Sequence, residues 1–140
     1  MTNQMYPCLW FDGQAKAAAD HYCSIFKNSS ITAENPIVVT FELNGNKFMG
    51  LNGGPKYTFT PATSFVIECQ TQEEIDYYWE KLGAGGRYDQ CGWLDDKFGV
   101  SWQVVPSVLH ELMADPDRAP RVMGAFMKMS KFDIQTLMDA

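Results

Sequence analysis

Apolar residues along this chain have first the spacing of a buried strand and then the spacing of an amphipathic helix, and this order occurs twice. Residues 5–11 form a short apolar segment of the kind found in buried strands, and residues 65–69 form another. Each is followed by a segment, 13–26 and 72–82, in which apolar side chains return every three or four residues, as on one face of an amphipathic helix. In the first helix these positions are Ala15, Ala18, Ala19, Tyr22, Ile25 and Phe26.

Turn residues and further strand-like segments follow each strand–helix pair, so the repeated unit is longer than the pair itself. We predict one module over about residues 5–55 and a second over about residues 62–106, followed by a helical tail over residues 107–140. The length of 140 residues fits a single domain, residues 1–140, with a substantial core. Two similar modules in one domain predict a shared cleft between the halves.

Polar residues at the predicted helix starts indicate where the helices begin. The carboxylate of Asp12 is expected to cap a helix that starts at Gly13. Thr71 and Glu74 have the spacing of a capping box, in which each satisfies a backbone amide of the other. The second helix is therefore expected to begin at Gln72.

Turn residues predict a β-hairpin in each module. The Asn-Gly pair at residues 44–45 tolerates positive φ and is expected to join strands over residues 36–43 and 47–52. In the second module the Asp-Asp pair at residues 95–96 is expected to turn the chain into a strand over residues 100–105, with both carboxylates in solvent.

The tail is predicted to contain two helices that stand outside the repeat. Ser107 is expected to cap a short helix that runs to Met113, and a second helix is expected over residues 117–129. One face of that second helix carries Val122, Met123, Phe126 and Met127. A methionine-rich stripe of this kind indicates a packing surface or a subunit contact.

Composition excludes two classes of partner. The formal net charge is −6, with eleven Lys and Arg scattered among seventeen Asp and Glu, so no basic stripe is available for nucleic acid. No apolar run approaches the roughly 20 residues that span a bilayer, which predicts no membrane insertion. The polar start lacks the features of a signal peptide, and a cytoplasmic location is expected.

Cysteine and histidine are too few and too far apart for a recognisable metal or redox motif. The four cysteines form no Cys-x-x-Cys pair and are predicted to be free thiols, three of them in buried apolar segments. Cys91, flanked by turn residues, is expected to be the most exposed. The two histidines, His21 and His110, fall in separate predicted helices, which excludes a histidine-rich metal site.

Four motifs, in this order along the chain, resemble those of one family. They are Pro-Cys-Leu-Trp-Phe-Asp-Gly at residues 7–13, Leu-Asn-Gly-Gly-Pro at 51–55, Gln-Cys-Gly-Trp at 90–93 and Asp-Lys-Phe-Gly-Val-Ser-Trp-Gln-Val-Val-Pro at 96–106. The chain resembles the PhnB-like proteins, also labelled by their 3-demethylubiquinone-9 3-methyltransferase domain. They belong to the vicinal oxygen chelate superfamily, with glyoxalase I, bleomycin-resistance proteins and extradiol dioxygenases. The chain has no Gly-x-Gly-x-x-Gly, so a Rossmann-type cofactor cradle is absent and no cofactor is predicted.

The resemblance implies an α+β fold of the glyoxalase/bleomycin resistance/dioxygenase type. In that fold, paired βαβββ modules form curved half-barrels, here with C-terminal helices, and the ligand occupies the concave cleft between the modules. A homodimer is also implied. The chain departs from its relatives between residues 30 and 38, where it is shorter, which leaves the second strand uncertain.

Enzymes of the superfamily hold a divalent ion with His, Glu or Gln side chains from four strands. By the resemblance, the matching positions here fall near residues 5–7, 63–64 and 51–52 and at Gln103. Only Asn52 and Gln103 among them can coordinate an ion, and two neutral amides do not offset the cost of dehydrating a dication. We therefore predict no tightly bound metal.

Ligand-binding candidates come from the strands and from the turn before the last hairpin. Adjacent strand residues point to opposite faces, so only one of Trp102 and Gln103 can line a cleft, and the family pattern selects Gln103. The tryptophans offer aromatic walls and the amides offer donors and acceptors. The predicted ligand-binding residues are Trp10, Asn52, Cys91, Trp93 and Gln103.

The sequence leaves three function classes open. The leading prediction is a PhnB-like protein that binds a small organic molecule in the inter-module cleft without a tightly bound metal. The alternative is a metal-dependent lyase, isomerase or dioxygenase whose metal is weakly recruited. A structural or interaction domain is the third, favoured only if the cleft is filled by the chain's own side chains. Whether the chain is an enzyme stays open at this stage.

Overall fold

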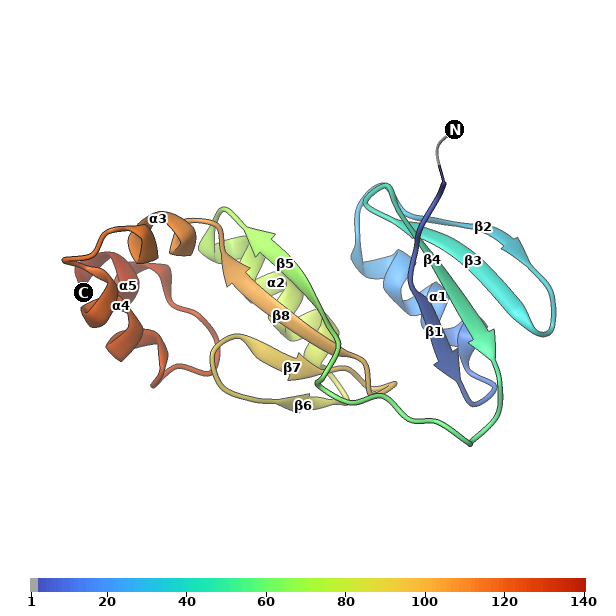
Figure 1. Ribbon diagram of the computed structural model, residues 1–140. Helices are drawn as coiled ribbons and strands as arrows, with labels where there is room; N and C mark the ends of the chain where they lie inside the picture. Colours follow the sequence, from blue (N-terminus) through green and yellow to red (C-terminus); the bar gives the residue numbers. More distant parts are fainter. Residues whose placement is uncertain (1–2) are drawn as a thin grey trace. The chain divides into compact units, whose positions relative to one another are not determined.

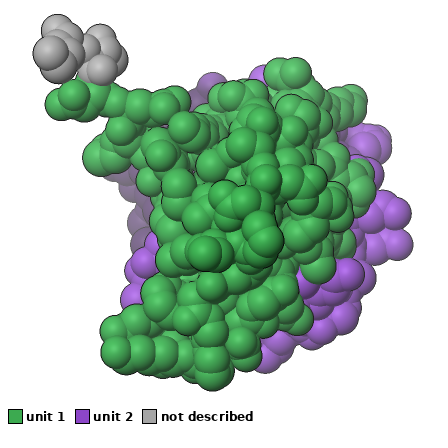
Figure 2. Space-filling view, turned by 90° about the vertical axis from the view of Figure 1, so that its right-hand side faces the viewer, with its two compact units in different colours: residues 1–59 green, residues 60–140 purple. Residues whose placement is uncertain are grey.

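The chain folds into two compact units, Met1–Phe59 and Thr60–Ala140, in a computed structural model that describes residues 3–140 (Figures 1 and 2). Each unit contains one four-stranded sheet, and neither sheet closes into a barrel within the described residues. The fold is therefore α+β with a repeated strand–helix–hairpin pattern, as predicted. None of the helices formed by residues 3–140 has the length and apolar character needed to cross a lipid bilayer.

The first unit follows the predicted order of one strand, one helix and three strands. Its elements are β1 (Cys8–Phe11), α1 (Ala15–Ile25), β2 (Ser30–Glu34), β3 (Val38–Leu43) and β4 (Asn46–Asn52). The sheet order is β1-β4-β3-β2, with β1 parallel to β4 and the other neighbours antiparallel (Figure 1). The strand that the shortened loop left uncertain, β2, is present as an edge strand.

Alternating burial along the strands of the first unit places the core on one face of the sheet. In β3 every second residue is buried, and the buried face of α1 packs against it. Gly50 on β4 permits this close approach, because a Cβ added there would lie 3.1 Å from the Ala15 Cβ. The core contains Leu9, Phe11, Ala15, Ala18, Ala19, Tyr22, Ile25, Val39, Phe41, Leu43 and Phe48.

The second unit repeats the pattern with shorter outer strands. Its elements are β5 (Ser64–Cys69), α2 (Gln72–Gly83), β6 (Arg87–Tyr88), β7 (Trp93–Asp95) and β8 (Ser101–Pro106), with sheet order β5-β8-β7-β6. Again the first strand is parallel to the last, β5 to β8. The core of this sheet and helix contains Cys69, Ile75, Leu82, Leu94, Val100, Trp102 and Val104.

Three short helices complete the second unit: α3 (Leu109–Ala114), α4 (Ala119–Phe126) and α5 (Ile134–Asp139). The sequence predicted the first two and missed the last, which Asp133 caps by accepting from the Thr136 amide at 2.9 Å. The tail is tied to the sheet through backbone bonds from Cys91 to Met129 and from Gly92 to Ser130, each 2.8 Å long. It buries Val122, Phe132 and Leu137.

The start of α1 differs from the prediction. The helix begins at Ala15 rather than Gly13, and Asp12 is exposed instead of capping it. The Ala15 amide donates to Asn52 Oδ1 at 2.9 Å, so the cap comes from the end of β4, far along the chain. Gly13, at φ 78°, makes a turn that separates Asp12 from the helix.

The start of α2 is close to the prediction. Thr71 Oγ1 accepts from the Glu74 amide at 3.2 Å, and the helix begins at Gln72. The Glu74 carboxylate, however, accepts from the amide of Gln70 at 3.3 Å rather than from that of Thr71. Ser107 does not cap α3; its amide donates to Cys69 O at 2.8 Å, which extends the β5–β8 connection.

The two hairpins close by different means. Asn44 and Gly45 adopt φ values of 51° and 82°, which confirms the predicted turn between β3 and β4. The expectation that Asp96 is solvated is wrong, since this residue is only 3% exposed. Its carboxylate accepts from the amides of Phe98 and Val100 at 2.8 and 3.0 Å and from Trp102 Nε1 at 2.8 Å.

Candidate functional site

Each sheet carries its helix on one face (Figure 1). The opposite face is here called the open face, and it is formed by the strand side chains that point away from the helix. Strand alternation assigns residues to it, because neighbours in sequence point to opposite sides. The first open face carries Cys8, Trp10, Val38, Thr40, Glu42, Lys47, Met49 and Leu51. The second carries Ser64, Val66, Glu68, Arg87, Trp93, Asp95, Ser101, Gln103 and Val105.

The centre of the first open face is apolar. Strand pairing aligns Trp10 on β1 with Leu51 on β4, and Leu51 with Val38 on β3. The indole Nε1 of Trp10 donates to Gly54 O at 2.8 Å, and its ring meets Tyr57 edge-on with 5.0 Å between centroids. Trp10 is therefore fixed as an aromatic surface, with its one polar atom already bonded.

Asn52 lies at the end of the first sheet with both ends of its side-chain amide engaged. Oδ1 accepts from the Ala15 amide at 2.9 Å, and Nδ2 donates to Pro36 O at 3.1 Å. These bonds hold the start of α1 and the loop before β3 against the end of β4. The role that these contacts support directly is structural, and a role in ligand binding stays a prediction.

The centre of the second open face is polar. Strand pairing aligns Gln103 on β8 with Val66 on β5 on one side and with Trp93 on β7 on the other. Gln103 Nε2 donates to Ser64 Oγ at 3.0 Å, which orients the amide within the plane of the face. Trp102 points to the other side and is 3% exposed, so the expected division between these two neighbours holds.

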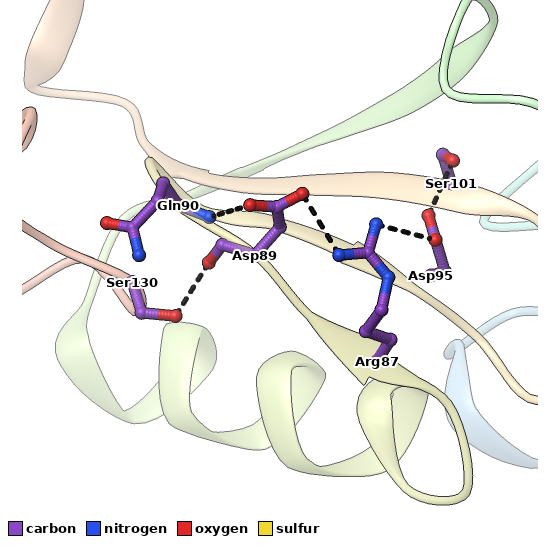
Figure 3. A network of polar contacts seen from close by, with 6 residues as sticks. All are labelled: Arg87, Asp89, Gln90, Asp95, Ser101 and Ser130. Atoms are coloured by element: carbon purple, nitrogen blue, oxygen red, sulfur yellow. Dashed lines mark hydrogen bonds and ion pairs between the residues drawn. The ribbon is translucent and has the colours of Figure 1, made fainter.

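A second polar row runs from Ser101 on β8 to Arg87 on β6, at the edge of the sheet (Figure 3). On β8 this row is two residues away from Gln103. Asp95 accepts from Ser101 Oγ at 2.7 Å and from Arg87 Nη2 at 3.1 Å. Arg87 Nη1 reaches Asp89 at 3.3 Å, while the Asp89 backbone oxygen accepts from Ser130 Oγ at 2.6 Å. The hydrogen bond that Arg87 donates to Asp95, together with the charge of that carboxylate, raises the pKa of the Arg87 guanidinium, so both carboxylates face a permanent cation.

The sequence alone did not single out Arg87, and it predicted that Asp95 lies in a solvated turn. The spacing of Arg87 and Asp89 carried a usable signal, because residues two apart on an extended segment lie on the same side. Asp95 could not be found in this way, since its link to Arg87 depends on the β6–β7 pairing.

Cys91 is half-buried rather than the most exposed thiol, and Cys8 is the exposed one. Cys91 has φ 58°, and its Sγ contacts Phe126 O at 3.6 Å and Met127 Sδ at 4.0 Å. It therefore packs against the end of α4. All four cysteines are free, as expected.

Only one of the three cysteines expected to be buried is so. That residue is Cys69, and burial raises the pKa of its thiol to about 12, which makes it a poor nucleophile. Cys23 is half-buried and Cys8 is exposed.

One concave pocket with a volume of about 310 Å³ lies where the starts of α2 and α5 meet. It is lined by Gln70, Thr71, Gln72, Asp133, Ile134 and Gln135, and so contains none of the predicted ligand-binding residues. The Gln72 amide spans it, donating to Phe132 O and accepting from the Ile134 amide, both at 2.9 Å. Gln72 therefore docks the tail, while Thr71 and Asp133 cap the helices that they precede.

The residues at the metal positions that the resemblance implies do not fit a divalent ion. Asn52 Oδ1 is bonded to the helix amide, and the Gln103 amide is bonded to Ser64. Residues 5–7 and 63–64 supply no imidazole or carboxylate. Among residues 3–140, no three His, Cys, Asp or Glu side chains are grouped closely enough to hold a metal. A site of neutral amides alone would bind a dication weakly.

Comparison with known proteins identifies the family. The sequence profile of the 3-demethylubiquinone-9 3-methyltransferase family matches residues 3–105. A solved structure described as a putative 3-demethylubiquinone-9 3-methyltransferase, PhnB protein, from Bacillus cereus is 33% identical. It aligns over 75% of this chain and 100% of its own, with a TM-score of 0.69. Among curated proteins, none matches.

More distant structures share the fold alone. Protein PA1353 from Pseudomonas aeruginosa is 17% identical, with coverage of 75% and 98% and a TM-score of 0.62. The fosfomycin resistance protein FosX from Listeria monocytogenes, solved with Mn(II) and sulfate, is 18% identical, with coverage of 81% and 97% and a TM-score of 0.60. The chain belongs to the 3-demethylubiquinone-9 3-methyltransferase, or PhnB-like, family.

Proposed function

We propose that this protein binds a small organic molecule on the open faces of its sheets and does so without a tightly bound metal. The observation that carries the proposal is the central row of the second open face, where an oriented amide lies between an aliphatic and an aromatic side chain. Binding sites for small molecules combine apolar area with a few fixed polar groups in this way. Gln103 and Trp93 are the principal contacts on the second open face, and Trp10 is the proposed contact on the first. Asn52 and Cys91 stay in the proposed set as neighbours of these faces, since Asn52 is bonded to the start of α1 and Cys91 packs against the end of α4.

Binding is favoured over catalysis by the chemistry of these groups. An amide and a serine hydroxyl can orient a ligand but do not exchange protons near neutral pH. The one cation of the polar row, Arg87, is bonded to two carboxylates, which limits its use in stabilising a developing negative charge. His110 lies outside this row, 2.9 Å from Glu68.

A melting-temperature screen against a panel of aromatic and amphipathic metabolites and drugs tests the proposal. Wild-type protein should gain thermal stability with at least one compound, since a ligand that binds only the folded state stabilises it. Gln103→Leu and Trp93→Phe should remove or reduce that gain, whereas Gln14→Leu, a change at an exposed residue of the first unit, should leave it intact. A panel that shifts neither wild type nor control contradicts the proposal.

The proposal that no metal is tightly bound has a separate test. Protein purified without chelator should carry no stoichiometric Mn, Fe, Ni or Zn by elemental analysis. A full equivalent of any of these ions, lost in Gln103→Leu, would replace the binding proposal with the metal-dependent lyase, isomerase or dioxygenase alternative.

We propose in addition that the protein is a homodimer. Met123 on α4, Met127 directly after α4 and Met138 on α5 are 47%, 60% and 44% exposed, which leaves apolar area available for a subunit contact. Light scattering coupled to gel filtration should give twice the chain mass of 15.8 kDa. A monomer mass across the accessible concentration range would reject this.

A further inference from the structure

The net negative charge of the chain comes entirely from the second unit. Residues 1–59 contain four Lys and Arg and four Asp and Glu, so their net charge is zero. Residues 60–140 contain seven Lys and Arg and thirteen Asp and Glu, which gives the whole −6. A field of one sign over a unit attracts ligands of the opposite sign.

The second open face carries part of this excess. Its charged groups are Glu68 and Asp95 on the strands and the Arg87–Asp89 pair at the edge. Arg87 is the one cation among them, and it is held by two carboxylates at 3.3 and 3.1 Å. An anionic ligand would therefore meet no uncommitted positive group among these residues and would have to approach an excess of carboxylates.

The central row presents a hydrogen-bond acceptor. Because Gln103 Nε2 donates one of its two N–H groups to Ser64 Oγ, the amide oxygen Oε1 and the second N–H are left for a ligand. In the neighbouring row, the Ser101 hydroxyl donates its hydrogen bond to Asp95, so the group available to a ligand there is the Asp95 carboxylate, which is also an acceptor. Both positions suit a ligand that brings its own hydrogen-bond donors.

An aromatic ring stands next to these acceptors. Trp93 lies directly across the strand pair from Gln103 and two residues before Asp95 on β7. Residues two apart on a strand are separated by about 7 Å on one face. A ligand ring lying on Trp93 could therefore place an ammonium group near Asp95 if two or three bonds of chain join ring and nitrogen.

We propose that the second open face selects aromatic cations of the arylalkylamine class. The ring lies on Trp93, and the ammonium donates to Gln103 Oε1 and Asp95. This inference rests on the proposed function and adds the charge and shape of the ligand to it. It excludes phosphonates and carboxylates as preferred ligands of this face.

Three probes of matched shape test the inference by titration followed with protein NMR: 2-phenylethylammonium, 2-phenylethanol and 3-phenylpropionate. The cation should bind at least about tenfold more tightly than the anion, with the alcohol between them. The shifts should centre on the Trp93 indole and the Gln103 side-chain amide. Raising the salt concentration should reduce the ratio of the two affinities.

Charge variants sharpen the test. Asp95→Asn should weaken binding of the ammonium probe about five- to tenfold and leave the affinity for the alcohol unchanged, because only the ionic part of the contact is lost. Gln103→Glu should strengthen binding of the ammonium probe, and Gln103→Lys should abolish it. Asp139→Asn on α5 removes the same formal charge away from this face and is the matched control, expected to be silent.

The outcomes separate this inference from the proposed function. If the alcohol or the anion binds as tightly as the cation, the charge class is wrong while ligand binding stands. The class is also wrong if all three probes fail although the metabolite panel gives a ligand that depends on Gln103. If probes and panel both fail, the binding function itself is rejected. An equal effect of Asp95→Asn and Asp139→Asn would show a diffuse field rather than a site.

Discussion

The two open faces are built on the same strand arrangement and differ in the residue at their centre. In the first, Leu51 lies between Trp10 and Val38; in the second, Gln103 lies between Val66 and Trp93. Each row thus holds one tryptophan and one valine around a central side chain. The comparison shows how a repeated backbone can supply apolar area on one face and an oriented polar group on the other.

The difference extends to the neighbouring rows. In the first sheet, Met49 pairs with Cys8 and Thr40, which offers one weak thiol and one hydroxyl. In the second sheet, the equivalent place beside the centre holds Ser64, Ser101 and Asp95, which are linked to Gln103 and Arg87 by hydrogen bonds. A fixed polar network is able to discriminate among ligands, whereas an apolar face mainly contributes buried area.

The largest expected effect concerns the two hairpins. Asp96→Ala should destabilise the protein by about 3 kcal/mol, because the amides of Phe98 and Val100 and the Trp102 indole lose a buried charged acceptor. Asn44→Ala, in the other hairpin, should cost about 1 kcal/mol through its left-handed backbone alone. Urea unfolding of both variants measures the difference, and an equal cost would contradict a special role for the buried carboxylate.

A smaller effect is expected where a glycine supports the aromatic surface of the first open face. A Cβ at Gly53 would overlap the Trp10 indole, so Gly53→Ala should displace that ring and cost about 2 kcal/mol. Gly124→Ala on α4 meets nothing within 4 Å and should instead stabilise by about 0.5–1 kcal/mol. Thermal unfolding and the near-ultraviolet circular dichroism of tryptophan test the pair. A silent Gly53→Ala would show that Trp10 is not fixed.

The two helix caps should differ less. Asn52→Ala removes the acceptor for the Ala15 amide and the donor to Pro36 O, for a cost of about 1.5 kcal/mol. Thr71→Ala removes one local cap bond and should cost about 1 kcal/mol. Hydrogen exchange at the first turns of α1 and α2 locates each loss. If Asn52→Ala keeps full stability but loses ligand binding, its role is recognition rather than capping.

The smallest effect belongs to the tail, which has no counterpart in the first unit. The Lys131 ammonium, 2.9 Å away, and the Gln72 amide lower the pKa of Asp76. This contribution is present above the ordinary carboxyl pKa of about 4 and is lost as pH falls through the lower folded value. Both groups are largely exposed, so Lys131→Met should cost a few tenths of a kcal/mol at pH 6 and nothing at pH 2. Acid unfolding curves that stay separated at low pH would contradict this.

The features that were predicted correctly depend on residues close together in the sequence. The Asn44-Gly45 turn and the start of α2 at Thr71 depend on residues adjacent in sequence, and both were found. Asp12 misled because a carboxylate before a helix is usually its cap, whereas here an amide from a distant strand supplies the acceptor. The strand β6 is two residues long and is defined by its pairing with β7, so it is too short for a periodic pattern in the sequence to predict it.

The part of the candidate site that depends on the alternation of side chains along a strand could be predicted from the sequence. Gln103 and Trp93 follow from alternation and from the family motifs, and the structure aligns them across β7 and β8. The Arg87–Asp95 link and the Gln103–Ser64 bond were not predictable, because each joins strands whose register is set by packing.

By itself, the sequence determined the repeated order of strands and helices, the hairpin turn of the first unit and the family, since all of these depend on spacing along one segment. Tertiary structure alone decided that Asn52 caps a helix 37 residues earlier, that Asp96 is buried and that Arg87 is held by two carboxylates. The physical reason is that a polar side chain takes whichever partner the fold brings within bonding distance, and that partner is fixed by packing and strand register rather than by neighbours in the chain.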